Sequence, residues 1–468
     1  MYDFLLLASC LLFVGTCLAY VRQPAASLFH PVTIYLGFHG FIFVIRPLFA
    51  RLYDFDLVYR VYDFQPSMTD KITVILGANL AMLVFTFVGL RAASLPRLAT
   101  ARAPDFERLR ERLAEPILLA ATLLAPLAIA SQISGWSRRM DPYATMTRDA
   151  GTGIMVNVNS NGWFADSALI LAPLAVFAVW LLRYRALGWA VFALASVLML
   201  GSGGRGSFIF AAAAISIVFL LERERRWFDL RIAALGVVAL LTFNAVVLDR
   251  GEAVRGLFGG SDGHVSSSTY DLDPLEHMDF ANLEYFEFIV YAVPQRTGSW
   301  DYFAHNLQIF TEPVPRALWA DKPIGSPVKF FELWDYGTPI GMTISLPGAG
   351  WMSLGYLGIA IYAGFFALLY GWVYTRLLVQ SGTATAVLTY SLLAATSIVV
   401  FRDGLLLTLL RQLPFYFGPF LLVLLFARLN TPKVRAGPQG TAQTGEAPAD
   451  RRRALAARAA PERQSRGA

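Results

Sequence analysis

Residues 187–221 read LGWAVFALASVLMLGSGGRGSFIFAAAAISIVFLL. Two apolar runs, each close to the length of a membrane-spanning helix, are joined here by the turn Ser202-Gly203-Gly204-Arg205-Gly206-Ser207. A cation between two apolar spans costs free energy unless an anionic partner compensates it. The three glycines of the turn let a backbone or a ligand approach Arg205 closely. The stretch therefore predicts a helical membrane protein in which Arg205 binds an anion.

The whole chain has the composition of a polytopic membrane protein. Its 468 residues are 56% hydrophobic and only 15% charged, and a soluble protein of this length does not bury so much apolar side chain. We therefore expect an all-α fold with about eleven membrane-spanning helices. These helices are expected at residues 3–21, 31–50, 72–90, 117–133, 165–182, 187–201, 207–221, 231–248, 350–375, 384–401 and 412–427.

One long hydrophilic stretch divides these helices. The expected organisation is an N-terminal bundle of about eight helices (1–248), a large periplasmic loop carrying short helices (249–349), about three C-terminal helices (350–428) and a basic cytoplasmic tail (429–468). The tail is rich in Ala, Gly, Pro and Arg. Such a composition cannot build a core, so we expect the tail to be disordered.

The charge distribution predicts the orientation of the chain. If the tail is cytoplasmic, eleven spans place the N-terminus outside, and the inner segments then carry 23 of the 39 Lys and Arg residues but only 10 of the 33 Asp and Glu residues. Because cytoplasmic loops are enriched in Lys and Arg, this orientation is favoured. Topology and contact with membrane lipid headgroups then explain the net charge of +6, and no nucleic-acid partner is expected.

A few cations oppose this rule because they fall on the outer side. They come from four regions of the chain: Arg205; Arg402, which precedes Asp403; Arg411; and Arg316 with Lys322. Guanidinium is a planar, permanently charged fork that suits phosphate, whereas lysine acts as a point charge. We interpret the set as a site for a lipid diphosphate. The alternative is that each arginine pairs with a nearby carboxylate or extends to the membrane interface.

Two further patterns occur in the long loop. Residues 282–291 alternate aromatic and acidic side chains and predict an interfacial helix that is too short to span a membrane. Residues 313–323 contain three prolines together with Arg316, Trp319 and Lys322. Such a stiff segment suits saccharide binding, with the Trp319 indole stacked on a sugar face and the cations holding phosphate. For Trp319 alone, the alternative is an ordinary tryptophan at the membrane interface.

The Pro315-Arg316-x-x-Trp319-x-x-Lys322-Pro323 pattern in an outer loop resembles the Wzy-type O-antigen (oligosaccharide repeat-unit) polymerases, which are GT-C-like polytopic glycosyltransferases. The turn around Arg205 is similar to their Ser/Thr-Gly-x-Arg-Gly turn, and residues 348–358 are similar to the small-residue-rich span that follows their loop. The resemblance covers residues 195–430. The acidic Ser- and Gly-rich stretch 251–275 departs from the family pattern, and no histidine aligns with a family motif.

The resemblance implies a metal-independent glycosyltransferase without a cofactor. Such an enzyme moves a growing glycan from one undecaprenyl diphosphate to the terminal sugar of another lipid-linked repeat unit. It acts at the periplasmic face of the bacterial inner membrane, in the synthesis of lipopolysaccharide, capsule or exopolysaccharide, often with a chain-length regulator protein. Cations that stabilise the leaving diphosphate contribute most of this catalysis. Diphosphate contact is therefore assigned to Arg205, Arg316 and Arg402, with Lys322 and Arg411 in support.

The acceptor hydroxyl must also lose a proton to a positioned base, for which the candidates are His305, Glu312 and Asp403. Two other functions stay open. A ligase-like lipid-to-acceptor glycosyltransferase shares the topology and the arginines. A flippase for polyprenyl-linked oligosaccharides is the non-enzymatic alternative. Such transporters usually show paired repeats and ionisable residues deep within their spans, whereas the middles of these spans are nearly uncharged.

Overall fold

The computed structural model describes residues 1–93, 105–140, 146–148, 155–157, 162–201, 205–230, 232, 275–276, 278–311, 319, 330–339 and 341–430. These residues form an all-α polytopic membrane protein, as the composition predicts. The strands within these ranges, β1 (Met146–Arg148) and β2 (Met155–Asn157), make one short antiparallel pair. The chain divides into two units, Met1–Ala427 and Arg428–Ala468, and the helical bundle belongs to the first.

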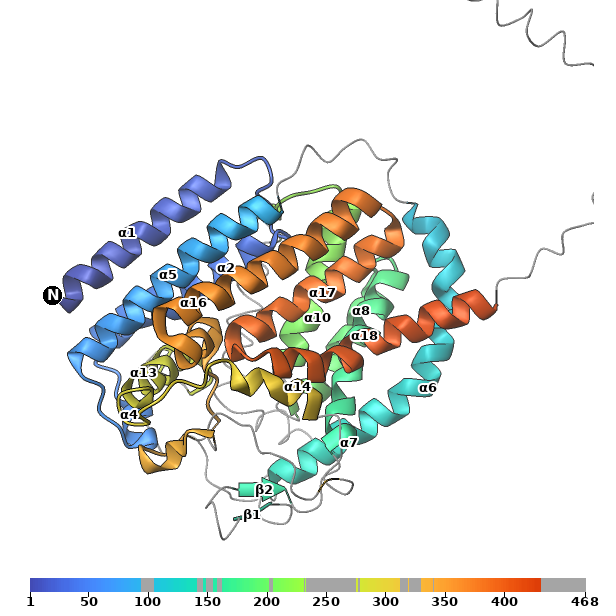
Figure 1. Ribbon diagram of the computed structural model, residues 1–468. Coiled ribbons are helices and arrows are strands. Elements are labelled where there is room, and N and C mark those ends of the chain that lie inside the picture. Colours follow the sequence, from blue (N-terminus) through green and yellow to red (C-terminus); the bar gives the residue numbers. More distant parts are fainter. Residues whose placement is uncertain are drawn as a thin grey trace, which may run out of the picture. The chain divides into compact units, whose positions relative to one another are not determined.

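Eight helical segments in the described ranges are long and apolar enough to cross a membrane (Figure 1). They are α1 (Tyr2–Val21); α2, η1 and α3 in series (Pro31–His39, Gly40–Ile45, Arg46–Leu52); α5 (Met68–Ala92); α6 (Phe106–Met140); α7, η2 and α8 in series (Gly162–Asp166, Ser167–Ile170, Leu171–Leu181); α16 with η7 (Ser345–Tyr374, Thr375–Ser381); α17 (Ala384–Asp403); and α18 (Leu406–Leu429).

Shorter helices complete the described part. Two of them are apolar, α9 (Ala186–Gly201) and α10 (Arg205–Glu222). The others are α4 (Leu57–Tyr62), η4 (Met278–Phe280), α13 (Asn282–Ala292), η5 (Ala304–Leu307), α14 (Gln308–Thr311) and η6 (Leu333–Asp335). Every expected span coincides with a helix except 231–248, which lies outside the described residues apart from residue 232. The number eleven therefore stays a prediction.

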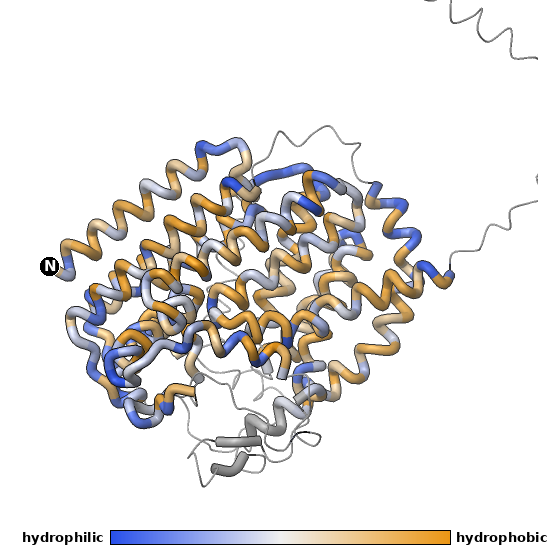
Figure 2. Tube along the Cα trace, in the orientation of Figure 1, coloured by the Kyte–Doolittle hydropathy of each residue, from blue (hydrophilic) through white to orange (hydrophobic). Residues whose placement is uncertain are grey.

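Buried apolar side chains form two clusters. One joins α6, α8, α10, α18 and the first half of α17, and the other joins α2, α5, α13, α16 and the end of α17. Large apolar side chains such as Leu11 of α1 and Leu123 of α6 are exposed, as expected for helix faces that contact lipid. Figure 2 shows that hydrophilic residues gather near the ends of the helices.

Local sequence signals set the ends of α17. The Thr383 hydroxyl accepts a hydrogen bond from the backbone N–H of Ala386, at 3.2 Å, and so caps the start of the helix. The helix ends at Gly404, whose φ of +73° is readily adopted by glycine. These two signals place Arg402 and Asp403 in the last turn of the helix.

Helix α16 is interrupted at Leu354 and Gly355, where the backbone is not helical (φ −164°, ψ 38° and φ 59°, ψ −140°). A Cβ on Gly358 would lie 2.0 Å from the carbonyl oxygen of Gly350. Because eight residues of a straight α-helix span about 12 Å, residues 345–354 must fold back on the beginning of the second half. We call residues 350–358 the α16 elbow.

Helix α13 packs against α5 and α16 and is buried on every side from Asn282 to Val290. The sequence predicts an interfacial helix here. The helix is present, but it is covered by protein on all sides and is not exposed at a membrane surface. The reason is that its carboxylates, Glu284 and Glu287, bind Arg46 of α3 and Tyr59 of α4 instead of water.

Candidate functional site

The ends of two helices from the predicted arginine regions meet at one end of the bundle, which we call the Arg402 end. Helices α10 and α17 pack against each other (Figure 1). Helix α10 begins at Arg205, and α17 ends at Arg402 and Asp403. The following turn lies directly on the start of α16, since a Cβ on Gly404 would lie 2.1 Å from the carbonyl oxygen of Ser345. Only glycine fits this approach.

Tyr416 of α18 shows that a third region joins the same place. Its ring stacks on Phe210 of α10, with the ring centroids 4.0 Å apart. Its hydroxyl lies within electrostatic range of Ser207, Asp403 and Asp166. The first turn of α10, the end of α17 and the first half of α18 therefore converge, although they are far apart in sequence.

Arg411 in α18 already has a carboxylate partner. Its Nε donates to Oδ2 of Asp166 at 2.6 Å, and its Nη2 donates to Oδ1 at 3.1 Å. This two-point geometry is a strong form of arginine–carboxylate pairing, and it fastens α18 to α7. The charge of Arg411 is thus balanced within the protein, which corresponds to the alternative interpretation of these cations.

Arg402 differs from Arg411 in the pairing of its guanidinium among the described residues. It is partly exposed, and no carboxylate of the described residues lies within ion-pair distance of it. Its backbone is firmly held: the Asn282 amide donates to the carbonyl oxygens of Arg402 and Thr343, at 2.8 Å each. The end of α17 is therefore fixed by α13, and no carboxylate of the described part of the chain neutralises the Arg402 guanidinium.

The structure describes the other predicted site residues only in part. Arg205 is the first residue of α10, but its side chain lies outside the described part of the structure. Arg316, Lys322 and Glu312 lie wholly outside it. Trp319 is 41% exposed. The predicted roles of these residues in diphosphate, proton and sugar contact stay predictions.

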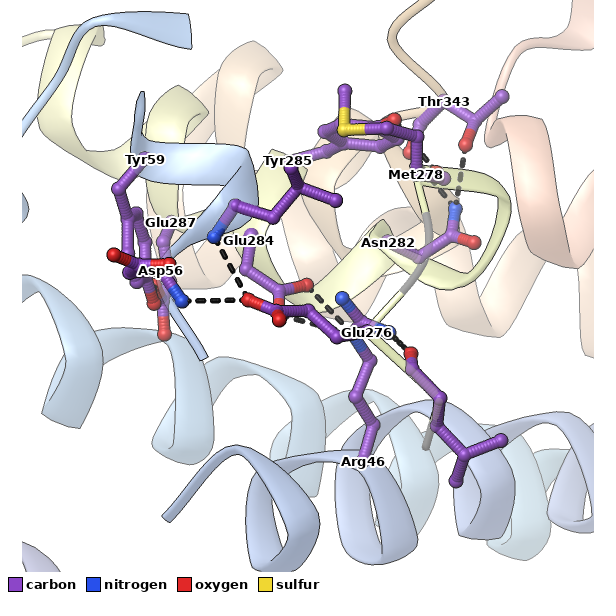
Figure 3. A network of polar contacts seen from close by, with 12 residues as sticks. Arg46, Asp56, Tyr59, Glu276, Met278, Asn282, Glu284, Tyr285, Glu287 and Thr343 are labelled. Atoms are coloured by element: carbon purple, nitrogen blue, oxygen red, sulfur yellow. Dashed lines mark hydrogen bonds and ion pairs between the residues drawn. The ribbon is translucent and has the colours of Figure 1, made fainter. Parts of the chain in front are cut away.

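A buried ion pair that the sequence analysis missed anchors α13 (Figure 3). Arg46 donates through Nε to both carboxylate oxygens of Glu284, at 2.9 and 2.8 Å, and through Nη1 to the carbonyl oxygen of Leu275, at 2.5 Å. Both charged side chains are almost fully buried. A signal was present in the sequence, because an ionisable residue inside the apolar stretch 31–50 normally has a specific partner.

Two other carboxylates near α13 are also held. Glu276 accepts hydrogen bonds from two backbone N–H groups at the start of α4, at 2.7 and 2.8 Å, and so caps that helix. Glu287 accepts from the Tyr59 hydroxyl at 2.6 Å. Burial raises the pKa of Glu287 from its ordinary value to about 7, although the nearby Lys71 acts to lower it. These contacts hold α13 in place rather than forming an open binding surface.

His305 is buried and has a hydrogen-bond partner at each ring nitrogen. Nδ1 pairs with the Asp301 carboxylate, and Nε2 lies 2.5 Å from the Tyr362 hydroxyl. A carboxylate that orients an imidazole is the arrangement by which many enzymes prepare a histidine base. Asp403, the other described candidate, lies beside Arg402 and has no such orienting partner among the described residues.

The segment that carries His305 is fastened to the α16 elbow. The backbone N–H groups of Asp301 and Tyr302 donate to the carbonyl oxygens of Met352 and Ser353, at 3.2 and 3.1 Å. These two carbonyls precede the interruption of α16, where intrahelical partners are lost. The break in the helix thus creates the acceptors that position the loop.

The His305 group and the Arg402 end adjoin opposite ends of the first half of α16. Gly404 contacts Ser345, and Asp301 is bonded to Met352. The seven helical steps from Ser345 to Met352 span about 10 Å along α16. Within the described ranges, no three His, Cys, Asp or Glu side chains are grouped as ligands for a metal ion.

Comparison of the chain with known protein families, with curated protein sequences and with solved structures finds no match in any of the three.

Proposed function

We propose that this protein is a metal-independent glycosyltransferase that polymerises lipid-linked oligosaccharide repeat units. It transfers the growing glycan from undecaprenyl diphosphate to the terminal sugar of another lipid-linked repeat unit, at the periplasmic face of the bacterial inner membrane. The observation that carries the proposal is that α10, α17 and α18 converge at the Arg402 end, and that this end and the Asp301–His305 pair adjoin opposite ends of a stretch of α16 about 10 Å long.

Arg402 has the chemistry that the leaving group requires. As the bond between the anomeric carbon and the phosphate oxygen breaks, negative charge develops on the diphosphate. A guanidinium such as that of Arg402, which has no carboxylate partner in the described ranges, can stabilise this charge through two parallel hydrogen bonds. The attraction is stronger near the apolar membrane than in bulk water. Arg205, Arg316 and Lys322 complete the proposed diphosphate set from their positions in the sequence.

Arg411 has a different part in the proposal. Because Asp166 already neutralises it, it contributes chiefly by holding the start of α18 against α7. Its effect on the leaving diphosphate is then indirect and smaller than that of Arg402. The proposed site thus has one cation, Arg402, that is unpaired within the described residues and stands on a fixed helix end, and one paired cation, Arg411, that holds α18 in position.

The test compares Arg402→Ala and Arg402→Lys with Arg376→Ala in cells that lack the native gene copy. Arg376 is a matched control because it lies in η7, beyond the far end of α16 from the elbow, and bonds only to Gln380 among the described residues. Loss of one charge-stabilising donor costs about 10²–10³-fold in rate. We expect Arg402→Ala to leave surface glycans one repeat long at normal protein level.

The two substitutions at Arg402 separate charge from geometry. Lysine keeps the charge but not the planar fork, so Arg402→Lys is expected to give short chains. The control variant Arg376→Ala is expected to give chains of normal length. Normal chains in both Arg402 variants contradict the proposal. Long chains that stay on the lipid carrier indicate a ligase-like transferase instead, and single repeat units retained on the cytoplasmic side indicate a flippase.

A further inference from the structure

Asp301, His305 and Tyr362 form a continuous hydrogen-bonded chain that the arginine chemistry does not use. Their exposed fractions are 2%, 4% and 5%. The first two belong to the segment before α14, and Tyr362 belongs to the second half of α16. Buried polar groups are stable only when their hydrogen bonds are made, and this chain makes them from two separate elements.

Asp301 determines which nitrogen of His305 carries a hydrogen. Oδ1 of Asp301 accepts from the backbone N–H of Phe303 at 2.8 Å, and Oδ2 meets Nδ1 of His305. Since an ionised carboxylate only accepts, Nδ1 must be the donor. In the neutral ring, Nε2 is then the nitrogen that can accept a proton. It faces the Tyr362 hydroxyl.

The Tyr362 hydroxyl can donate its single hydrogen to His305 or to Asn306, and the Ser353 side chain also lies beside it. It lies 2.5 Å from Nε2 of His305 and 2.8 Å from Oδ1 of Asn306. With a neutral ring the hydroxyl donates to Nε2, and with a protonated ring it donates to Asn306 while Nε2–H donates to it. The Phe303 ring stacks on the phenol, with centroids 5.6 Å apart, and holds it in place. The two states differ in proton positions alone.

We propose that Tyr362 relays the proton of the acceptor hydroxyl to His305, and that Asp301 is the positioning residue of this relay. The proposal rests on the proposed function. The acceptor gives its proton to the phenol oxygen while the phenol passes its own proton to Nε2. The acceptor oxygen bonds to the anomeric carbon, and the bond from that carbon to the phosphate oxygen breaks with its electron pair going to the diphosphate. Asp301 stabilises the resulting imidazolium.

The experiment measures initial rates of repeat joining by the full-length protein in proteoliposomes. The substrate is the lipid-linked repeat unit extracted from the native host after deletion of its own copy of the gene. A general base contributes about 10²–10⁴-fold, so His305→Gln is expected to lower kcat by at least about 100-fold. Tyr362→Phe and Asp301→Asn are expected to lower kcat at least about ten-fold, with KM changed less than about two-fold.

Two control variants match the substitutions. Tyr370→Phe removes a buried hydroxyl two turns further along α16, which lies 3.3 Å from the Thr396 hydroxyl. Asp335→Asn neutralises an exposed carboxylate in the same outer region. Both are expected to keep the kcat of the unaltered protein. The amount of folded protein and its unfolding midpoint are measured for every variant, because a merely structural role changes these and leaves the kcat of the folded fraction intact.

The outcomes separate this proposal from the function it rests on. An unchanged kcat in Tyr362→Phe or Asp301→Asn overturns the relay, as does a loss confined to the amount of folded protein. If Arg402→Ala abolishes joining while those two variants are normal, the polymerase function stands and the relay fails. If Arg402→Ala joins repeats normally as well, the diphosphate role of Arg402 and the relay both fail, and if the unaltered protein joins no repeats, the proposed function itself fails.

Discussion

At the scale of single residues, burial makes the Arg46–Glu284 ion pair important for stability. The two side chains are 1% and 2% exposed, and removing one of them leaves an unpaired buried charge, which costs about 3–5 kcal/mol. We expect Arg46→Met and Glu284→Gln each to lower the free energy of unfolding by about that amount, and Arg46→Met with Glu284→Leu to recover most of it. Denaturant unfolding in detergent micelles, run as a double-mutant cycle, measures this.

The exposed Arg60–Asp56 pair is the control for that cycle. Its atoms are 2.9 Å apart, but the side chains are 61% and 57% exposed, so Arg60→Met is expected to change the free energy of unfolding by less than about 1 kcal/mol. Equal losses from Arg60→Met and Arg46→Met would show that burial of the Arg46 pair is not what makes it important.

Glu287 makes stability depend on pH. Burial raises its pKa in the folded protein to about 7, above the ordinary value of 4.5, so the folded protein holds this proton more tightly than the unfolded chain does. The stability it contributes is therefore complete below about pH 4.5 and is lost as the pH rises through 7, a total of about 3 kcal/mol. The unfolding midpoint is expected to fall over this range, and Glu287→Gln is expected to flatten the slope. If the unfolding midpoint of Glu287→Gln depends on pH as steeply as that of the unaltered protein, Glu287 is not the group responsible.

At the scale of elements, the α16 elbow depends on the absence of side chains. A Cβ on Gly358 would lie 2.0 Å from the Gly350 carbonyl oxygen, and backbone cannot move aside as a flexible side chain can. We expect Gly358→Ala to lower the free energy of unfolding by about 1–3 kcal/mol and to lower kcat by displacing the carbonyls that hold Asp301. Gly418→Ala is the control, since nothing lies within 4 Å of its Cβ, and it is expected to be neutral or stabilising. Tolerance of Gly358→Ala in both measurements contradicts the elbow.

The helices and the elbow differ in how far the sequence predicts them. Apolar length is a local property, so the positions of the spans follow from composition alone. The meeting of Gly350 and Gly358 depends on a loop that binds the carbonyls between them, and no local pattern encodes it. The sequence identifies His305 as a candidate base. Asp301, four residues earlier, could also have been predicted as its partner, but the sequence analysis did not identify it. Tyr362 was not identifiable, because it is 57 residues away and meets His305 only in the folded chain.

At the scale of the whole molecule, the described part of the long loop belongs to the helical bundle. Helix α13 shares one buried apolar cluster with α2, α5 and α16, and its Asn282 amide fixes the end of α17. Asp301 is likewise held by α16. The proposed base and the proposed diphosphate ligand are therefore both positioned by membrane helices, so substitutions in the loop and in the bundle are expected to act on the same site.

Orientation in the membrane decides whether this site can meet its substrate. The helical stretch from residue 356 to residue 381 is about 35–40 Å long. This length exceeds the apolar thickness of a membrane, about 30 Å, so we expect the elbow and Gln380 to lie on opposite sides. The excess of Lys and Arg in the predicted inner segments predicts that Gln380 lies inside. The chain has two cysteines, both free thiols, which can be replaced by serine to give a background for single-cysteine labelling.

In that background, Tyr302→Cys reports on the elbow side and Gln380→Cys on the other side, and both positions are exposed. A membrane-impermeant thiol reagent is expected to label Tyr302→Cys in intact spheroplasts and Gln380→Cys only after permeabilisation. The charge rule is a difference in insertion free energy rather than a contact, so labelling tests it independently of the fold. The reverse pattern would place Arg402 and His305 in the cytoplasm, where assembled repeat units are not presented for polymerisation, and would remove the basis for the proposed function even if the helices are as described.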